Sequence, residues 1–277
     1  MISSLLLPFL MQSATPYGSP IDPVLRPSEI KREGPVNSPP VKKARTPSDI
    51  RFDQCLDQAE SDPANGLLAA NKWQIEGGGY LARNCLGFAY AEQEDWPKAI
   101  VEFVQAAEKA QAAGDDRAGN FWSQAGNAAL ASGDYQRALK YFDTALEQED
   151  LDGLLKGEVH LDMGRAFVAL DQYDQAKQQF VMVHQLVPQD PLGWLLSATL
   201  ARRMGDLVQA KSDIAVAAKL VTTDPAIALE AGNIAYEAGD LANARSNWEQ
   251  AVKFDPDSSS AKAAARYLAQ LLTGAEQ

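Results

Sequence analysis

Residues 126–145 read GNAALASGDYQRALKYFDTA, and residues 232–251 read GNIAYEAGDLANARSNWEQA. Both stretches begin with Gly, carry a Gly-Asp pair near the middle and place Ala at matched positions. Apolar residues follow the 3.6-residue period on either side of the Gly-Asp pair, which is typical of two helices joined by a tight turn. The recurrence of such a unit predicts an architecture built from repeats.

The same register recurs between and before these two stretches. Small residues of the second helix recur at Ala138, Ala176, Ala210 and Ala244, and large apolar residues follow each of them after four residues, at Phe142, Phe180, Ile214 and Trp248. Twelve residues before the Ala positions lie Gly126, Gly164 and Gly232, and an earlier copy carries Gly87, Ala99 and Phe103. The last Ala positions are 34 residues apart, so this is the period of the repeat.

This pattern resembles the tetratricopeptide repeat family, over five units at 80–113, 119–152, 157–190, 191–224 and 225–258. The resemblance implies an all-α fold, an α-solenoid wound as a right-handed superhelix of helix-turn-helix units. No unit can bury its own apolar faces, so the units must stack and both ends must be sealed. We expect degenerate N-terminal cap helices within residues 48–79 and a single C-terminal capping helix over residues 259–273.

The turn residues predict how the two helices of a unit are joined. Gly133, Gly205 and Gly239 suit the left-handed residue that ends a first helix, because Gly adopts this conformation without steric cost. The Asp that follows each Gly can accept a hydrogen bond from the first turn of the second helix.

The N-terminal region differs in composition from the repeats. Residues 1–14 contain a short apolar block and predict a signal peptide or apolar leader, and the Pro-rich residues 15–47 predict a disordered tether. We therefore expect export, to a periplasm of bacterial type. The alternatives are a chain tethered to the membrane by an uncleaved N-terminus and a cytoplasmic chain.

The charge is unevenly distributed along the chain. The whole chain of 277 residues carries −12, whereas residues 1–47 hold six basic and three acidic side chains, so residues 48–277 carry about −15. A nucleic-acid partner needs a concentrated cationic face, and the repeats lack one in their composition. No apolar stretch from Ser48 onward is long enough to span a bilayer, so we expect no membrane insertion of the folded array.

Residues that could carry catalysis or bind a metal are scarce. His160 and His184 fall in different predicted helices, and no clustered ligands at metal-binding spacing accompany them. Neither a nucleophile motif nor a phosphate-binding loop is present. We therefore expect a protein that is not an enzyme and that holds no metal or cofactor.

The two cysteines lie one helical pair apart, Cys55 in the first cap helix and Cys85 in the first helix of the first unit. Equivalent positions of neighbouring helical pairs face one another in a solenoid, so we expect a Cys55–Cys85 disulfide that holds the cap on the array. The alternative is two buried free thiols, which a cytosolic protein would favour.

The family resemblance also implies a function. Tetratricopeptide arrays bind extended or helical segments of other proteins in the concave groove lined by their first helices. We therefore expect an adaptor that binds a peptide or helix of a partner protein; the alternative is a self-oligomerising structural component of the cell envelope. Transferring the groove positions of the family to this chain gives Asn120, Gln124, Asn127, Arg165, Arg202, Asn233 and Tyr236.

Overall fold

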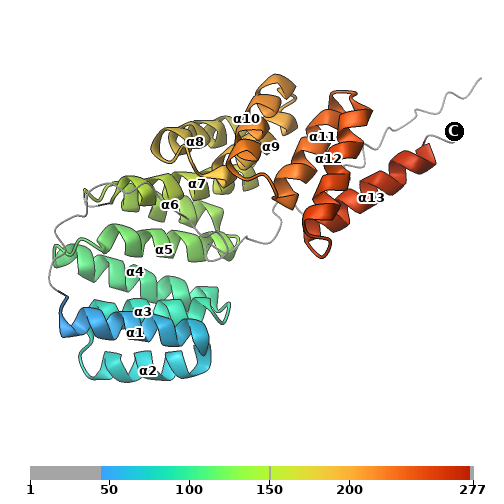
Figure 1. The fold of residues 1–277 in the computed structure, drawn as a ribbon. Coiled ribbons are helices and arrows are strands. Elements are labelled where there is room, and N and C mark those ends of the chain that lie inside the picture. Colours follow the sequence, from blue (N-terminus) through green and yellow to red (C-terminus); the bar gives the residue numbers. More distant parts are fainter. Residues whose placement is uncertain (1–44, 150, 275–277) are drawn as a thin grey trace, which may run out of the picture. The chain divides into compact units, whose positions relative to one another are not determined.

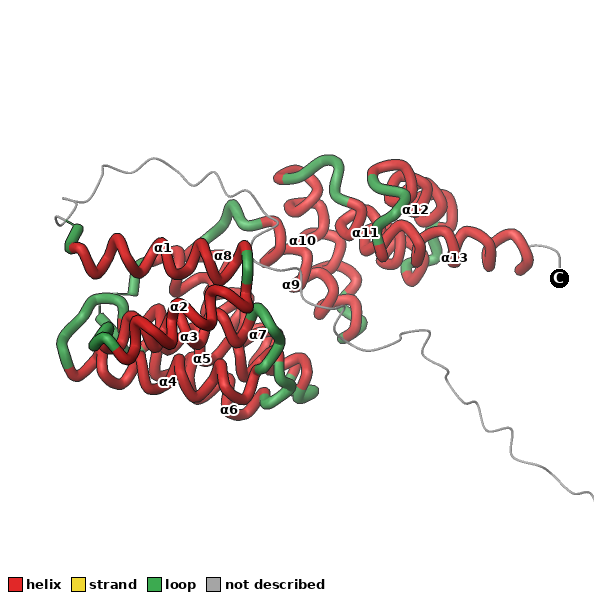
Figure 2. Tube along the Cα trace, turned by 90° about the horizontal axis from the view of Figure 1, so that it is seen from below, coloured by secondary structure: helices red, strands yellow, loops and turns green. Residues whose placement is uncertain are grey.

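The protein is described from a computed structural model, which places residues 45–149 and 151–274. Within these ranges every regular element is an α-helix, and short loops join the helices (Figure 2). The predicted all-α fold is confirmed for this part of the chain. The predicted leader at residues 1–14 and nearly all of the predicted tether at residues 15–47 lie outside the described residues.

Thirteen helices follow one another along the described chain (Figure 1). They are α1 (Pro47–Ser61), α2 (Pro63–Ile75), α3 (Gly79–Ala91), α4 (Trp96–Ala112), α5 (Ala118–Ala131), α6 (Tyr135–Leu146), α7 (Gly153–Ala169), α8 (Tyr173–Leu186), α9 (Pro191–Arg203), α10 (Leu207–Leu220), α11 (Pro225–Glu237), α12 (Leu241–Phe254) and α13 (Ser259–Gly274). We call α3, α5, α7, α9 and α11 the first helices, and α4, α6, α8, α10 and α12 the second helices. Each first helix packs on the second helix that follows it, and each second helix packs on the next first helix, which is a solenoid of five helix pairs.

The turns between first and second helices have the predicted geometry. Gly133, Gly205 and Gly239 have φ values of 81°, 79° and 78°. The Asp after each of them accepts a hydrogen bond from a backbone N–H three residues later, which caps the second helix. In two units a different residue, Glu94 or Asp171, adopts the left-handed conformation, with φ of 58° and 57°.

Close contact between a glycine and an aromatic ring joins the two helices in four of the five units. A Cβ atom added to Gly126 would lie 2.4 Å from the Phe142 ring, and Gly87, Gly164 and Gly232 face the rings of their own second helices just as closely. In the fourth unit, Ala198 and Ile214 occupy these two positions. The Gly allows the helices to approach and the ring fills the space between them.

Both ends of the array carry additional helices. At the N-terminal end, α1 packs on α2 where a Cβ atom added to Gly66 would lie 2.4 Å from the Ala59 Cα atom, and a disulfide joins Cys55 of α1 to Cys85 of α3, with 6.2 Å between their Cα atoms. At the C-terminal end, α13 covers α11 and α12, where Trp248 lies 5.2 Å from the Tyr267 ring.

Candidate functional site

The first helices carry the side chains that we expect to meet a partner. Successive first helices contact one another within the repeats: α5 packs on α7, α9 packs on α11, and Asn84 of α3 donates a hydrogen bond to Gln124 of α5. The structure therefore brings the predicted site residues together as two sets. Asn120, Gln124, Asn127 and Arg165 lie on α5 and α7, and Arg202, Asn233 and Tyr236 lie on α9 and α11.

The α5–α7 set is partly exposed and only partly engaged inside the protein. Gln124 accepts a hydrogen bond from the Nδ2 atom of Asn84, and Arg165 donates to Asp162 on its own helix at 2.8 Å. The amide oxygen of Asn127 is buried, and no group within the described ranges donates a hydrogen bond to it. A buried amide oxygen without a donor is an energetic cost to the folded protein.

The α9–α11 set is different, and the structure corrects our expectation for two of its residues. Arg202 is 4% exposed; its guanidinium donates to Glu230 at 2.6 Å and to Glu237. Asn233 is also buried, donating to Glu230 and accepting from the Nε1 atom of Trp248 at 3.1 Å. Both side chains are used in holding α9, α11 and α12 together, so neither is available as a contact for a partner.

Tyr236 is the exposed member of the α9–α11 set. Half of its surface is accessible, and its ring is tilted against Trp248 at a centroid distance of 5.7 Å. Sequence spacing predicted the repeat positions of these residues, but the carboxylates of Glu230 and Glu237 that neutralise Arg202 come from the next unit. That internal pairing is what the repeat pattern alone missed.

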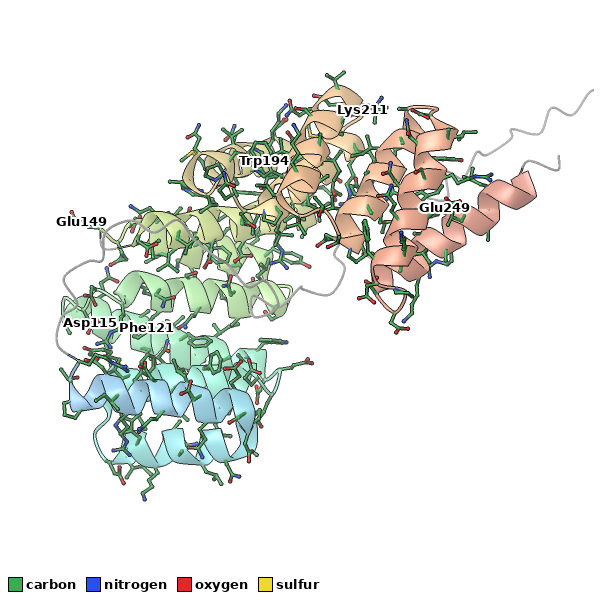
Figure 3. All side chains as sticks on the ribbon, viewed as in Figure 1. Asp115, Phe121, Glu149, Trp194, Lys211 and Glu249 are labelled. Carbon is green, nitrogen blue, oxygen red and sulfur yellow. A yellow bond between two sulfur atoms is a disulfide. The ribbon has the colours of Figure 1, made fainter. Side chains whose placement is uncertain are left out.

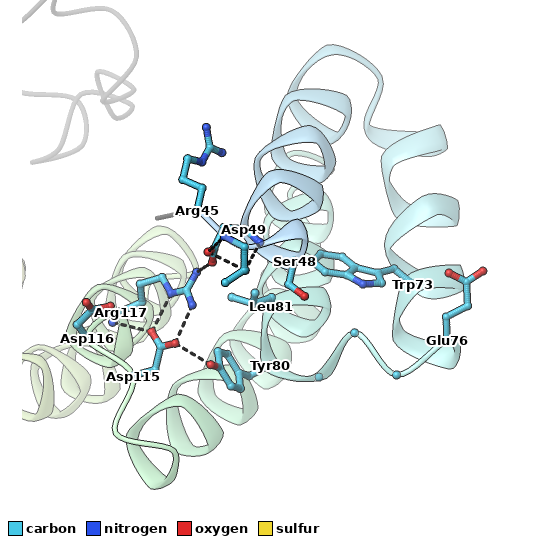
Figure 4. Close-up of a pocket in the computed structure, with 14 residues that line it drawn as sticks. Arg45, Ser48, Asp49, Trp73, Glu76, Tyr80, Leu81, Asp115, Asp116 and Arg117 are labelled. Atoms are coloured by element: carbon cyan, nitrogen blue, oxygen red, sulfur yellow. Dashed lines mark hydrogen bonds and ion pairs between the residues drawn. The ribbon is translucent and has the colours of Figure 1, made fainter. Parts of the chain in front are cut away.

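A further polar cluster lies where α1, the Gly77–Gly79 turn and the loop before α5 meet, beside a pocket of about 700 Å³ (Figure 4). Arg117 donates to Asp49 and to both carboxylate oxygens of Asp115, each at 2.7 Å, and Tyr80 donates to Asp115 at 2.6 Å. The hydrogen bonds from Arg117 hold the pKa of Asp115 well below its usual range. Because Arg117 is fully engaged by Asp49 and Asp115 inside the protein, we assign no ligand to this pocket.

The two histidines are engaged inside the protein. The Nδ1 atom of His160 lies 2.7 Å from the Oε1 atom of Gln179, and the ring of His184 stacks on Trp194 with 3.6 Å between centroids (Figure 3 labels Trp194). Among the described residues, no group of three or more His, Cys, Asp or Glu side chains could hold a metal ion. None of the described helices is long and apolar enough to cross a membrane.

Comparison with known proteins supports the repeat assignment. Residues 129–200 match the family model described as tetratricopeptide repeat. This match spans the end of α5, all of α6, α7 and α8, and most of α9. The comparison with curated proteins gave no match.

Solved structures of similar fold cover most of the chain. PilW, described as a widely conserved type IV pilus biogenesis factor, has a TM-score of 0.67 at 17% identity, covering 79% of this chain and 99% of PilW. The pilF protein of Pseudomonas aeruginosa has a TM-score of 0.63 at 17% identity, covering 78% of this chain and 97% of pilF. YrrB, described as a TPR protein with an unusual peptide-binding site, has a TM-score of 0.52 at 17% identity, covering 71% of this chain and 96% of YrrB. Residues 129–200 thus match the tetratricopeptide repeat family, and the described chain as a whole has the fold of a solenoid of tetratricopeptide-like helix pairs.

Proposed function

We propose that the protein is a non-enzymatic adaptor that binds a peptide or a helical segment of a partner protein on the α5–α7 part of its first helices. The contact residues are Asn120, Gln124, Asn127 and Arg165. Tyr236, which is exposed on α11, lies in the part of the array where other first-helix side chains are already engaged.

One comparison between repeats carries this proposal. Asn127 and Asn233 occupy the same position, directly after Gly126 and Gly232 in the two stretches of matched sequence. The Asn233 amide is satisfied inside the protein by Trp248 and Glu230. The Asn127 oxygen has no such donor among the described residues, although its residue is partly exposed on α5. The oxygen itself is buried, but the residue as a whole is partly exposed, and its NH2 group is a donor suited to a backbone carbonyl of a bound segment.

Proximity labelling in cells that produce the intact protein tests this assignment. A variant that combines Asn127→Ala with Arg165→Ala should lose at least about tenfold of the labelling of its partner, because it removes the two polar anchors. The control combines Gln178→Ala with Gln185→Ala, at two exposed positions of α8. If the partner is labelled equally by the wild-type protein and the α5–α7 variant, the proposed site is wrong.

We also propose that the protein is exported, with residues 1–14 as its leader and residues 15–47 as a disordered tether. The Cys55–Cys85 disulfide supports an oxidising compartment, because such bonds rarely persist in a reducing cytosol. Sequencing of the mature N-terminus and a count of free thiols without reductant test this. A mature chain that begins with residue 1 and carries two titratable thiols would contradict it.

A further inference from the structure

A groove of about 330 Å³ lies between the second helices α10 and α12, and α11 forms its floor. The floor is apolar: Ile214 of α10 and Ile234 and Ala235 of α11 are 7%, 1% and 8% exposed. This groove involves the second helices and none of the residues of the α5–α7 site. It therefore needs an explanation of its own.

The equivalent position one unit earlier is closed by hydrogen bonds. Ser197 of α9 donates to Asp213 of α10 at 2.7 Å, and Gln209 donates to the other oxygen of Asp213 at the same distance. These side chains cross the space between the helices and join them. Asp213 is consequently 1% exposed, although it carries a carboxylate.

The unit that borders the groove cannot form this closure. Thirty-four residues after Ser197, Gln209 and Asp213 stand Ala231, Asn243 and Asn247. Ala231 offers no hydrogen-bonding side chain, and Asn247 donates to the carbonyl oxygen of Asn243 on its own helix at 2.9 Å. The amides therefore line the groove instead of bridging it.

Aromatic rings occupy the matched positions in other units. Tyr141 stands where Asn247 stands and stacks on Trp122 at 5.8 Å, and Phe167 stands where Ala235 stands and packs against the core. The remaining floor residue, Ile214, takes the place that Phe103, Phe142, Phe180 or Trp248 fills elsewhere. The groove thus has space that Tyr141 fills in the second unit and Phe167 fills in the third, because smaller residues stand at the matched positions here.

The rim of the groove adds a cation and exposed apolar surface. Lys211 projects from α10 (Figure 3), and within the described ranges it forms no ion pair. The nearest rim carboxylate, Asp240, already accepts from the backbone and side chain of Asn243. Val208, one turn before Lys211, is 83% exposed, and Leu241, next to Asp240, is 53% exposed. Hydrogen bonds from Asn243 lower the pKa of Asp240, and the charge of Lys211 adds to that effect without a direct ion pair. A carboxylate on an incoming segment would therefore share Lys211 with Asp240.

We propose that this groove binds an aromatic side chain of a partner protein, with a carboxylate beside the aromatic residue pairing with Lys211. The aromatic ring takes from outside the place that Tyr141 or Phe167 takes from inside. Because the floor residues are already almost fully buried, the apolar area that the ring removes from water is mostly its own. The carboxylate forms an ion pair with Lys211, and this pair adds little to the binding free energy because it is exposed to solvent. The site is independent of the α5–α7 site and would exist even if the latter bound nothing.

Nuclear magnetic resonance of isoleucine methyl groups in the full chain tests the proposal, with acetyl-Phe-Asp-amide as the probe and acetyl-Ala-Asp-amide as its matched control. The Phe peptide should shift the Ile214 and Ile234 methyl signals in a saturable manner, through the ring current of the bound Phe, and should leave Ile100 of α4 unchanged. The Ala peptide should shift none of them. Lys211→Gln should weaken binding of the Phe peptide about threefold.

Two variants that fill the groove from inside decide the outcome. Asn247→Tyr copies the second unit and Ala235→Phe copies the third, and either variant that keeps the helical circular dichroism of the wild-type protein should abolish the shifts. The variant with Asn127→Ala and Arg165→Ala should bind the probe like the wild-type protein. The proposal is overturned if no saturable shift occurs at Ile214 and Ile234 up to about 20 mM probe, a very weak affinity, or if a folded filled variant still shows the shifts.

Discussion

Replacing Gly126 by Ala should destabilise the array, and replacing Phe142 by Ile in the same chain should cancel that effect. The added Cβ atom would lie 2.4 Å from the Phe142 ring, whereas ordinary contacts begin near 3.4 Å. The ring is fully buried, so it cannot rotate into solvent and must push the two helices apart. The fourth unit already contains the compensated pair, Ala198 with Ile214.

The expected magnitude follows from two opposing terms. Overpacking of a buried site costs up to about 3 kcal/mol, and the better helix propensity of Ala returns about 1 kcal/mol. Gly126→Ala should therefore lower the free energy of unfolding by about 2 kcal/mol. Phe142→Ile alone should cost about 1–2 kcal/mol through lost packing. The double variant should be no less stable than Phe142→Ile, which is a coupling free energy of about 2 kcal/mol between the two sites.

Urea denaturation followed by circular dichroism measures all four proteins of this cycle under the same conditions. Gly153→Ala is the matched control, because a Cβ atom there meets nothing within 4 Å and the residue begins α7. That control should be neutral or slightly stabilising. Additive effects of the two substitutions, with the double variant losing the sum of the single losses, would refute the packing argument.

Three further predictions concern the ends and the junctions of the array. Replacing Cys55 and Cys85 by Ser should cost about 3–4 kcal/mol for the 30-residue loop, and reductant should lower the denaturation midpoint of the wild-type protein but not of the variant. Burial holds the pKa of His184 below its ordinary value of 6.5. Below pH 6.5 the unfolded chain binds a proton at His184 that the folded chain does not bind. The contribution of His184 to stability is therefore present above pH 6.5 and is lost as the pH falls below 6.5. His184→Gln should flatten this part of the pH–stability curve, and an unchanged slope would contradict the assignment. Arg202→Ala should lower the free energy of unfolding, measured in urea, by about 3–5 kcal/mol because it leaves the Glu230 carboxylate buried without its cation. Adding Glu230→Gln should recover part of that loss. An Arg202→Ala variant as stable as the wild-type protein would show that the pair contributes little.

The sequence predicted the helices better than it predicted the binding residues. Period, turn glycines and capping Asp residues are local features, and the structure confirms them at Gly133, Gly205 and Gly239. The availability of a side chain is not local. Its repeat position led us to expect Arg202 in the binding groove. In the structure it pairs with carboxylates of the next helix pair, some 30 residues further along the chain.

The sequence by itself determined the repeat, its period of 34 residues and the helix pair in each unit, because apolar periodicity and turn residues act within a few residues of one another. Only the tertiary structure decided which side chains remain available for a partner. Asn127 and Asn233 are the same residue at the same repeat position, yet only Asn233 has its amide oxygen satisfied, by Trp248. Likewise, the space beside Ile214 exists because Ala231, Ala235 and Asn247, which come from two different helices, are all too small or too short to fill it. Packing depends on neighbours that folding brings together, and the sequence pattern does not contain that information.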